Sequence, residues 1–323
     1  MRVLVTGATG FVGQHLLRLL ASRGHTVFAT YLVPPTQELP VGVELLACDM
    51  KERNPVAEVL RHAQPQHVYH LAGLPSVTRS FAESRHVWNT NLGGAMNLLD
   101  AVREAAPKAR VLLVGSGQCY GNVAASRLPV TEDQPLAPDS PYAGSKAAAD
   151  LMGYQYFRSW KLQVIRARPF NHTGPGQPPQ FVCSDLARQV ARIDAGLCPP
   201  ALQVGNTRAQ RDFSDVRDVV SAYELLLERG QPGEAYNVAS GHVVSVAQIV
   251  RLLRPFCRRP FHVEVQQQRL RVGETSRLYG SNRKLRRDTG WKPQYSLSDT
   301  MKDVYTYWKT ALAAGSAHAA TGY

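Results

Sequence analysis

The sequence predicts an α/β fold in which a doubly wound parallel sheet is followed by a smaller α/β domain. Short runs rich in β-branched residues alternate with longer helical patterns over residues 1–168, which is typical of βαβ units around a buried parallel sheet. The first run leads directly into the glycine-rich turn VTGATGFVG, as in Rossmann-like folds. After Arg168, the Pro- and Gly-rich segment RPFNHTGPGQPPQ indicates a loop and the end of the first domain.

Each element follows from its local pattern. Six strands are predicted in the first domain: RVLVTG, HTVFATY, VELLACD, HVYHLAG, RVLLVGS and LQVIRARP. Helices are predicted between them over FVGQHLLRLLASRG, NPVAEVLRHAQ, residues 85–104 and residues 142–160. Beyond the loop we expect helices over residues 181–195, 216–228 and 246–253, a hairpin in PALQVGNTRAQRDFSDV and a strand in EAYNVAS. The resulting division is residues 1–168 and 169–312, with the chain crossing back between them, and a frayed tail over 313–323.

The composition limits the function classes. The hydrophobic fraction of 44% and the charged fraction of 19% are those of a soluble globular protein. No apolar run reaches the roughly 18 residues that span a bilayer, and no secretory leader is recognisable, so we expect a cytoplasmic protein without a membrane partner. The five cysteines are scattered singly, which argues against a disulfide framework and against a metal site.

The net charge of +12 favours anionic partners. Both a nucleic acid and a nucleotide-bearing small molecule have this property. Basic residues are spread along the chain apart from clusters at 254–259 and 283–287, and no basic motif is interleaved with aromatic residues. We therefore expect a small nucleotide ligand rather than nucleic acid.

The glycine-rich turn is a candidate dinucleotide site. Glycine at the end of a strand allows the tight turn and lets the backbone approach a pyrophosphate at the positive end of the next helix. A plain strand-to-helix turn is the alternative, but the strand, the helix and the N-terminal position all fit. We expect the cofactor to contact Gly7, Gly10, Phe11, Val12 and Gly13.

The adenosine half of the cofactor should lie at the ends of the second and third strands. Tyr31 ends the second strand, and its neighbours carry neither a carboxylate to repel a 2'-phosphate nor an arginine to bind one. The choice between NADH and NADPH is therefore open, with a slight preference for NADPH. Asp49 suits a contact to the adenine amino group with Met50 beside the ring, although Asp49 could also be a local cap.

Tyr142 and Lys146 are a candidate catalytic pair in SPYAGSKAAAD. They lie four residues apart in a predicted helix, so both face the same side with Cβ atoms about 6 Å apart. A cation beside the phenol, together with the positive nicotinamide ring of an oxidised cofactor, should lower the pKa of Tyr142 from near 10 toward neutrality. Tyr142 could then act as a general acid or base. The alternative is two polar residues on an alanine-rich helix.

These motifs come in one order along the chain. The nucleotide loop, HLAG, GSGQCYG and the Tyr142/Lys146 pair together resemble the extended short-chain dehydrogenase/reductase family over nearly the whole chain. The resemblance implies that Tyr142 and Lys146 are catalytic, that Lys146 also binds the cofactor ribose, and that Ser116 binds the reacting oxygen, unless it is only a turn serine. It also implies that the cofactor contacts Leu71, Ala72 and Gly73.

Gln118 departs from the pattern of one branch of this family. In the nucleotide-sugar dehydratases this position usually carries an acid that helps to expel water from the sugar. A neutral amide cannot exchange a proton in this way. We therefore expect Gln118 to contact the substrate, and we expect reduction rather than dehydration.

Candidate substrate residues follow the sixth strand. RPFNHTGPGQ resembles the loop in which an asparagine of nucleotide-sugar enzymes contacts the diphosphate or base, here Asn171. By the same resemblance Arg211 and Arg271 would bind the diphosphate and Glu274 the ribose hydroxyls, because guanidinium groups match phosphate oxygens. Taken singly, each of these arginines could equally be a solvated surface charge. SNRKLRRDTGWKP also resembles the family, and there we expect a structural helix that ends at Gly290.

The match is strongest with the group of reductases within this family that act on GDP-6-deoxy-4-keto-D-mannose. It implies that NAD(P)H reduces the C4 keto group of a GDP-linked 4-keto-6-deoxyhexose to give GDP-D-rhamnose, a precursor of bacterial surface polysaccharides such as lipopolysaccharide. A 4-epimerase with tightly bound NAD and an inactive redox sensor are the alternatives. The family also implies a homodimer formed by the helices near 91–104 and 142–160. The base, the C4 stereochemistry and the preferred cofactor stay open.

Overall fold

The computed structural model describes residues 1–35, 39–269 and 277–315, which form two compact units. The first unit comprises Met1–Phe170, Val219–Val238 and Gly280–Lys292, and the second comprises Asn171–Asp218, Ala239–Tyr279 and Pro293–Tyr323. The boundary expected at residue 168 lies close to the end of the first of these segments. Two later segments, which the sequence division assigned to the second domain, belong to the first unit.

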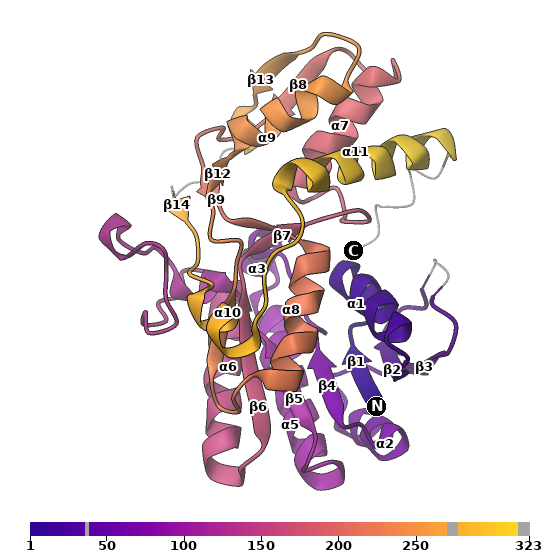
Figure 1. Cartoon of the computed structure of the whole chain (residues 1–323), viewed down its shortest axis with the longest axis vertical. Helices are drawn as coiled ribbons and strands as arrows, with labels where there is room; N and C mark the ends of the chain where they lie inside the picture. The colour runs from indigo at the N-terminus through magenta and orange to yellow at the C-terminus, as the bar shows by residue number, and fades with distance from the viewer. Residues whose placement is uncertain (36–38, 270–276, 316–323) are drawn as a thin grey trace. The chain divides into compact units, whose positions relative to one another are not determined.

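A parallel sheet of seven strands forms the centre of the first unit (Figure 1). Its order is β11 (Ala235–Val238), β6 (Gln163–Pro169), β5 (Arg110–Val114), β4 (His67–His70), β1 (Arg2–Thr6), β2 (Thr26–Tyr31) and β3 (Val43–Ala47). All six strands expected in this region are present, which confirms the Rossmann-like fold. The order reverses between β1 and β4, and ligands of such sheets bind at the carboxyl ends of strands at this kind of point.

Helices cover both faces of this sheet, as a doubly wound fold requires. One face packs against α1 (Phe11–Ser22), α8 (Val216–Arg229) and α10 (Arg283–Thr289). The other packs against α2 (Arg53–Ala63), α5 (Gly94–Ala105) and α6 (Pro141–Trp160). Two hydrophobic cores result, and the strands between them are apolar on both sides, as Val3, Leu4 and Val5 of β1 show.

The helix that carries the candidate catalytic pair begins at a well-formed cap. The Ser140 side chain accepts a hydrogen bond from the backbone of Ala143, and Pro141 occupies the first turn, where its missing N–H is tolerated. The helix ends at Lys161, which has a left-handed backbone with φ of 60°. Shorter helices, α3 (Val77–Ala82), α4 (Ser84–Trp88) and a π-helical turn (Asn89–Gly93), precede α5.

In the residues that the structure describes, the second unit contains three small groups of strands and three α-helices. The strand groups are β7 (Asn171–Thr173) with β10 (Phe213–Asp215), β9 (Gln210–Arg211) with β12 (Val244–Ser245) and β14 (Arg277–Leu278), and β8 (Ala201–Val204) with β13 (His262–Val265). The helices α7 (Val182–Asp194), α9 (Val246–Leu253) and α11 (Leu297–Ala313) supply most of one hydrophobic core.

The hairpin expected in PALQVGNTRAQRDFSDV is wrong. Its strands β8, β9 and β10 do not pair with one another, because each pairs with a strand from elsewhere in the second unit. Alternation along a chain indicates strands, but the choice of partner depends on segments that are distant in sequence.

Two further observations concern membrane and metal partners. No helix in the described part of the chain is long and apolar enough to cross a membrane. The five cysteines are free thiols, and residues 1–35, 39–269 and 277–315 contain no cluster of metal-binding side chains.

Candidate active site

The glycine-rich turn between β1 and α1 packs directly against the end of β4. Gly7 has a φ of +65°, and a Cβ atom there would lie 2.7 Å from the backbone of Ala72. A Cβ at Gly13 would lie 2.5 Å from the carbonyl oxygen of Ala8. At Gly10 a Cβ would lie 3.3 Å from the carbonyl oxygen of Gly7, which is a tight contact but less severe than those at Gly7 and Gly13. Packing therefore requires glycine most strongly at Gly7 and Gly13, and at Gly10 a side chain would need a small shift of the turn.

A buried hydrogen bond joins the two strand ends at this turn. The hydroxyl of Thr6 lies 2.8 Å from Nδ1 of His70 and also accepts a hydrogen bond from the backbone of Ala72. Burial, and to a lesser extent the charge of Lys146, lowers the pKa of His70 to about 3, so its ring is neutral. The sequence analysis did not single out Thr6 or His70. Their signal was present, because both are polar residues at the carboxyl ends of buried parallel strands.

The residues expected near adenine make local contacts. Asp49 accepts a hydrogen bond from the backbone of Lys51 and lies 3.3 Å from its ammonium group. Met50 is buried against Gly94, and its carbonyl accepts a hydrogen bond from the side chain of Asn97. Asp49 thus closes a local turn and does not cap α2, whose N-cap is Glu52, and its contact with adenine stays a prediction. Tyr31 ends β2, as expected.

Tyr142 and Lys146 lie together on the buried side of α6. Both side chains are buried, and Lys146 donates a hydrogen bond of 2.9 Å from Nζ to the carbonyl oxygen of Val114. Burial lowers the pKa of Lys146 to about 8. It raises the pKa of Tyr142 to about 12, and a hydrogen bond with Ser116 opposes this only in part.

For the side chains of this chain alone, the pKa of Tyr142 therefore shifts in the direction opposite to the predicted one, and the lowering by an oxidised nicotinamide stays a prediction. The sequence argument considered the charge of Lys146 and of the nicotinamide ring but not the removal of the phenolate from water. In the folded chain this desolvation is the largest influence, because an ionised phenolate loses its hydration when it is buried. Tyr142 consequently stays protonated at neutral pH.

Ser116 lies at the end of β5 and begins a turn of 3-10 helix, Gly117–Tyr120. Its hydroxyl accepts a hydrogen bond of 3.1 Å from the backbone of Gln118 and interacts with Tyr142. The structure thus brings Ser116, Tyr142 and Lys146 to one place, as expected from the sequence. Gln118, two residues after Ser116 in the same turn, is partly exposed.

A second polar contact supports the start of α6. Asn91 donates a hydrogen bond to the hydroxyl of Ser145, and Ser145 donates to the carbonyl oxygen of Tyr142. The Asn91 side chain also accepts from the backbone of Leu74, next to Gly73. Asn91 is buried in the π-helical turn, and the sequence analysis missed it because a π-helical turn has no clear pattern in sequence.

A buried ionic network lies deeper in the same unit. Asp150 accepts hydrogen bonds from Arg166 and from two nitrogen atoms of Arg168. Arg168 also donates to the hydroxyl of Tyr120, which donates in turn to Asn237 of β11. Asp150 lies four residues after Lys146 and therefore on the same helical face. A carboxylate on a face expected to be buried was the available signal that a cationic partner must exist.

The expected substrate residues belong mainly to the second unit. Asn171 is the first residue of β7, and Arg211 lies on β9 with one guanidinium nitrogen bonded to the carbonyl of Gln210. Arg271 and Glu274 lie outside the described residues. The roles of these four side chains therefore stay predictions.

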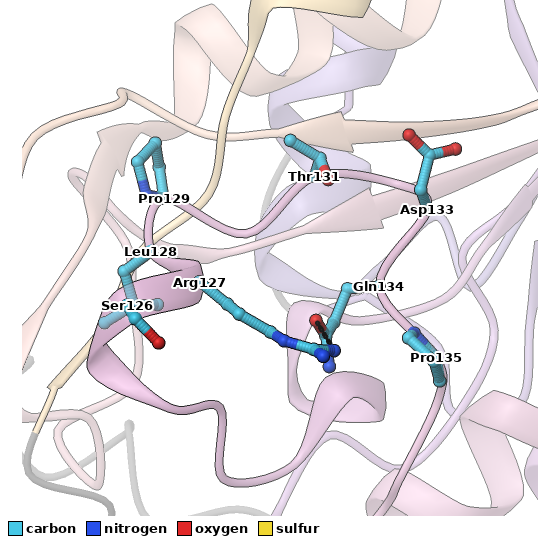
Figure 2. Close-up of a pocket in the computed structure, with 8 residues that line it drawn as sticks. All are labelled: Ser126, Arg127, Leu128, Pro129, Thr131, Asp133, Gln134 and Pro135. Carbon is cyan, nitrogen blue, oxygen red and sulfur yellow. Dashed lines mark hydrogen bonds between the residues drawn. The ribbon is translucent and has the colours of Figure 1, made fainter.

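A pocket of about 410 Å³ lies in the first unit beside the loop that follows the Ser116 turn (Figure 2). Its lining comes entirely from this loop: Ser126, Arg127, Leu128, Pro129, Thr131, Asp133, Gln134 and Pro135. None of the expected site residues lines it, and Figure 2 shows the side chain of Arg127 reaching across to the side chain of Gln134, which accepts its hydrogen bond. We assign it no role in the chemistry.

Comparison with known proteins gives consistent matches over nearly the whole chain. The family model described as GDP-mannose 4,6 dehydratase matches residues 4–304. The GDP-6-deoxy-D-mannose reductase of Pseudomonas aeruginosa is 36% identical over 309 residues, which cover 96% of this chain and 97% of that protein. The UDP-glucose 4-epimerase of Corynebacterium glutamicum is 27% identical over 99% of both chains. A solved structure described as RMD from Pseudomonas aeruginosa complexed with NADPH has a TM-score of 0.85 at 33% identity, covering 96% of this chain and 99% of that one.

Proposed function

Because the chain belongs to the GDP-mannose 4,6 dehydratase family, within the extended short-chain dehydrogenases/reductases, we propose that it is an NADPH-dependent reductase of a GDP-linked 4-keto-6-deoxyhexose. The product is GDP-D-rhamnose, formed by reduction of the C4 keto group of GDP-4-keto-6-deoxy-D-mannose. The observation that carries this proposal is the convergence of Ser116, Tyr142 and Lys146 in a chain that is 36% identical to a GDP-6-deoxy-D-mannose reductase.

The turn around Gly10 fits a dinucleotide. Glycine at this position carries no side chain between the backbone and a ligand, and the turn leads into the positive end of α1, where a pyrophosphate would bind. Bound NADPH would supply the hydride that reduces the keto carbon. The cofactor would extend along the ends of β1 and β4 toward Lys146, past Leu71, Ala72 and Gly73. The solved relative with NADPH favours this cofactor over NADH.

Tyr142 is suited to donate a proton to the reduced carbonyl oxygen. Its pKa of about 12 keeps the phenol protonated at neutral pH, which is the state that a reduction needs at its start. Ser116 would hold the same oxygen by a hydrogen bond. Lys146, whose ammonium group bonds to Val114, would stabilise the tyrosinate that remains after proton transfer and bind the cofactor ribose.

The nucleotide and sugar would be recognised by residues outside the catalytic group. We assign the diphosphate or the base to Asn171, the diphosphate to Arg211 and Arg271, and the ribose hydroxyls to Glu274, as the resemblance implied. Gln118 would contact the sugar. These assignments rest on the family's sequence pattern, with the reductase and dehydratase names of the relatives as support for a GDP sugar.

Two related reactions are less consistent with the site. A 4,6-dehydratase requires an acid near the sugar, and Gln118 cannot serve as one. A 4-epimerase would use the same Ser, Tyr and Lys residues and is represented among the relatives, but at lower identity than the reductase. It would also hold NAD through purification, whereas a reductase exchanges its cofactor in each turnover.

We propose a homodimer formed through α5 and α6. Leu151, Tyr154 and Trp160 of α6 and Met96 of α5 are large apolar side chains that remain exposed in the single chain. Exposed apolar side chains on neighbouring helices are typical of an interface between subunits. The proposal retains the expected cytoplasmic location.

The test is to mix the purified protein with NADPH and GDP-4-keto-6-deoxy-D-mannose and to follow the loss of NADPH absorbance. Turnover is expected with the wild type and should fall at least about 100-fold in Tyr142→Phe, in line with the size of general acid catalysis. GDP-mannose without reductant should give no product. Absence of turnover in the wild type, or undiminished turnover in Tyr142→Phe, contradicts the proposal.

A further inference from the structure

A continuous chain of buried polar contacts connects the catalytic helix to the turn that carries Ser116. Asp150 of α6 accepts hydrogen bonds of 2.9 and 2.8 Å from Nε and Nη2 of Arg168. Arg168 donates a third bond of 2.9 Å from Nη1 to the hydroxyl of Tyr120, which donates at 2.8 Å to Asn237. All four residues are at most 5% exposed. The hydroxyl of Tyr120 is therefore held between a fixed cation and a fixed amide.

We propose that Tyr120 is a positioning residue that holds Ser116 in register with Tyr142, an inference that rests on the proposed function. Tyr120 is the last residue of the 3-10 turn, and Ser116 caps the first. Asp150 lies one helical turn beyond Lys146 and two beyond Tyr142. The polar chain thus links the two segments that must meet at the substrate oxygen.

Movement of one end of the turn between Ser116 and Tyr120 should displace the other end, because the packing of the turn allows little internal movement. A Cβ at Gly117 would lie 3.0 Å from the ring of Phe170, and that ring stacks on Tyr120 with a centroid separation of 6.3 Å. The backbone of Cys119 bonds to Ser116 at one side and to Ala137 at the other. A shift at the Tyr120 end is therefore passed to the Ser116 end rather than absorbed between them.

Loss of the Tyr120 hydroxyl would disturb this chain in a defined way. Asn237 would lose its donor, and Nη1 of Arg168 would keep only its longer bond of 3.3 Å to the carbonyl of Glu132. Buried polar groups without partners are unfavourable, so both side chains would move to find others. A displacement of Ser116 by a fraction of an ångström would then misalign the substrate oxygen with Tyr142, which lowers the rate of chemistry more than substrate binding.

The chain offers a matched control for Tyr120→Phe. Tyr236 of β11 is also fully buried, and its hydroxyl also bridges two polar groups, accepting from the backbone of Gln231 and donating to Asp288. None of these partners belongs to the Ser116 turn or to α6. Tyr236→Phe therefore makes the same chemical change, with a similar loss of hydrogen bonds, away from the catalytic residues.

The experiment compares kcat, KM and Tm for both variants with NADPH and the 4-keto sugar nucleotide. We expect both to lose a few degrees of Tm, and only Tyr120→Phe to lose about 10- to 100-fold in kcat, with KM for both substrates within about threefold of wild type. Equal kcat values for Tyr120→Phe and Tyr236→Phe would overturn the proposal. A wild-type enzyme without turnover would instead contradict the proposed function.

A double variant tests whether Tyr120→Phe lowers kcat through Ser116 or through a general loss of order in the protein. If Tyr120 acts by placing Ser116, then Ser116→Ala combined with Tyr120→Phe should be no slower than Ser116→Ala alone. If the losses in kcat of the two single variants multiply in the double variant, Tyr120 acts independently of Ser116, and the proposal is overturned. Should Tyr120→Phe fail to fold, Asn237→Ala removes the acceptor of the Tyr120 hydroxyl, and an unchanged kcat in that variant would have the same consequence.

Discussion

Nζ of Lys146 donates a hydrogen bond of 2.9 Å to the carbonyl oxygen of Val114, the last residue of β5. The ammonium group of Lys146 is thus held in a buried position with a backbone acceptor, and burial lowers its pKa to about 8. The role that we propose for Lys146 requires a charged side chain, whereas burial makes this charge unfavourable for the stability of the fold.

Replacing Lys146 by Met should stabilise the protein at neutral pH. The pKa of Lys146 is about 8 in the folded state, lower than the ordinary value of 10.5. Below pH 8 the folded protein therefore holds a charged ammonium group away from water, which is unfavourable for folding. This penalty is about 3 kcal/mol and disappears as pH rises from 8 to 10.5. Loss of the bond to Val114 offsets part of it. We expect Lys146→Met to raise the free energy of unfolding by about 1 to 3 kcal/mol at pH 7, measured by urea denaturation.

The gain should shrink above pH 9, and the same variant should lose most of its reductase activity. Lys161→Met, at the exposed C-terminal end of the same helix, is the control and should change stability little at either pH. A Lys146→Met protein that is less stable than wild type at pH 7 contradicts the assigned burial penalty.

The pH dependence of the reduction should report Lys146 rather than Tyr142. Tyr142, with a pKa of about 12, stays protonated across the working range, whereas Lys146 loses its proton as pH rises through about 8. We expect kcat/KM to be level between pH 6 and 7 and to fall above about pH 8. In Lys146→Arg, which keeps its charge, the fall should disappear although the maximum rate is lower. An identical alkaline fall in both proteins would assign it to another group.

Two glycines of the nucleotide turn should respond differently to alanine. At Gly10 a Cβ would lie 3.3 Å from the carbonyl oxygen of Gly7, a contact that a small shift of the turn relieves, so Gly10→Ala should lose less stability than Gly13→Ala and should weaken NADPH binding by about tenfold or more through contact with the pyrophosphate. At Gly13 a Cβ would lie 2.5 Å from the carbonyl of Ala8, so Gly13→Ala should lose several degrees of Tm even without cofactor. Fluorescence titration and thermal unfolding measure the two effects. If Gly10→Ala binds NADPH with the affinity of the wild type, the pyrophosphate does not bind at this turn.

The proposed dimer is testable at Leu151. Its side chain is 57% exposed on α6 in the single chain, as is Leu197 in the loop after α7. Leu151→Asp should place a charge in the interface and give monomers in sedimentation velocity experiments, whereas Leu197→Asp should leave the assembly unchanged. A wild-type monomer, or dimers that persist in Leu151→Asp, would exclude an interface built on α6.

The first unit was largely predictable because each of its elements has a clear local pattern. The six strands from Arg2 to Pro169 are short, and helical segments follow four of them, β1, β3, β4 and β5, which indicates a parallel sheet. Ser116, Tyr142 and Lys146 come together for the same reason, since the ends of parallel strands and the next helix meet at one edge of the sheet. The strand Ala235–Val238 was expected, but its place beside β6 was not.

Other features depend on contacts that no local pattern contains. The three strands β8, β9 and β10 pair with distant segments, so the expected hairpin was wrong. The pKa of Tyr142 depends on how completely α6 is covered, which sequence spacing does not report. Asp150 and Arg168 were missed because each looks like an ordinary charged residue until the other is seen beside it.

The position of β11 has a consequence for synthesis of the protein. This outermost strand completes the parallel sheet beside β6, yet the ribosome makes it only after Asn171–Asp218 has emerged. Until then the nascent chain exposes the seven-residue strand β6 as an open edge, with donors and acceptors free to pair with another chain. A fragment that stops near Phe170 should therefore aggregate, and the growing polypeptide should depend on a chaperone during this interval.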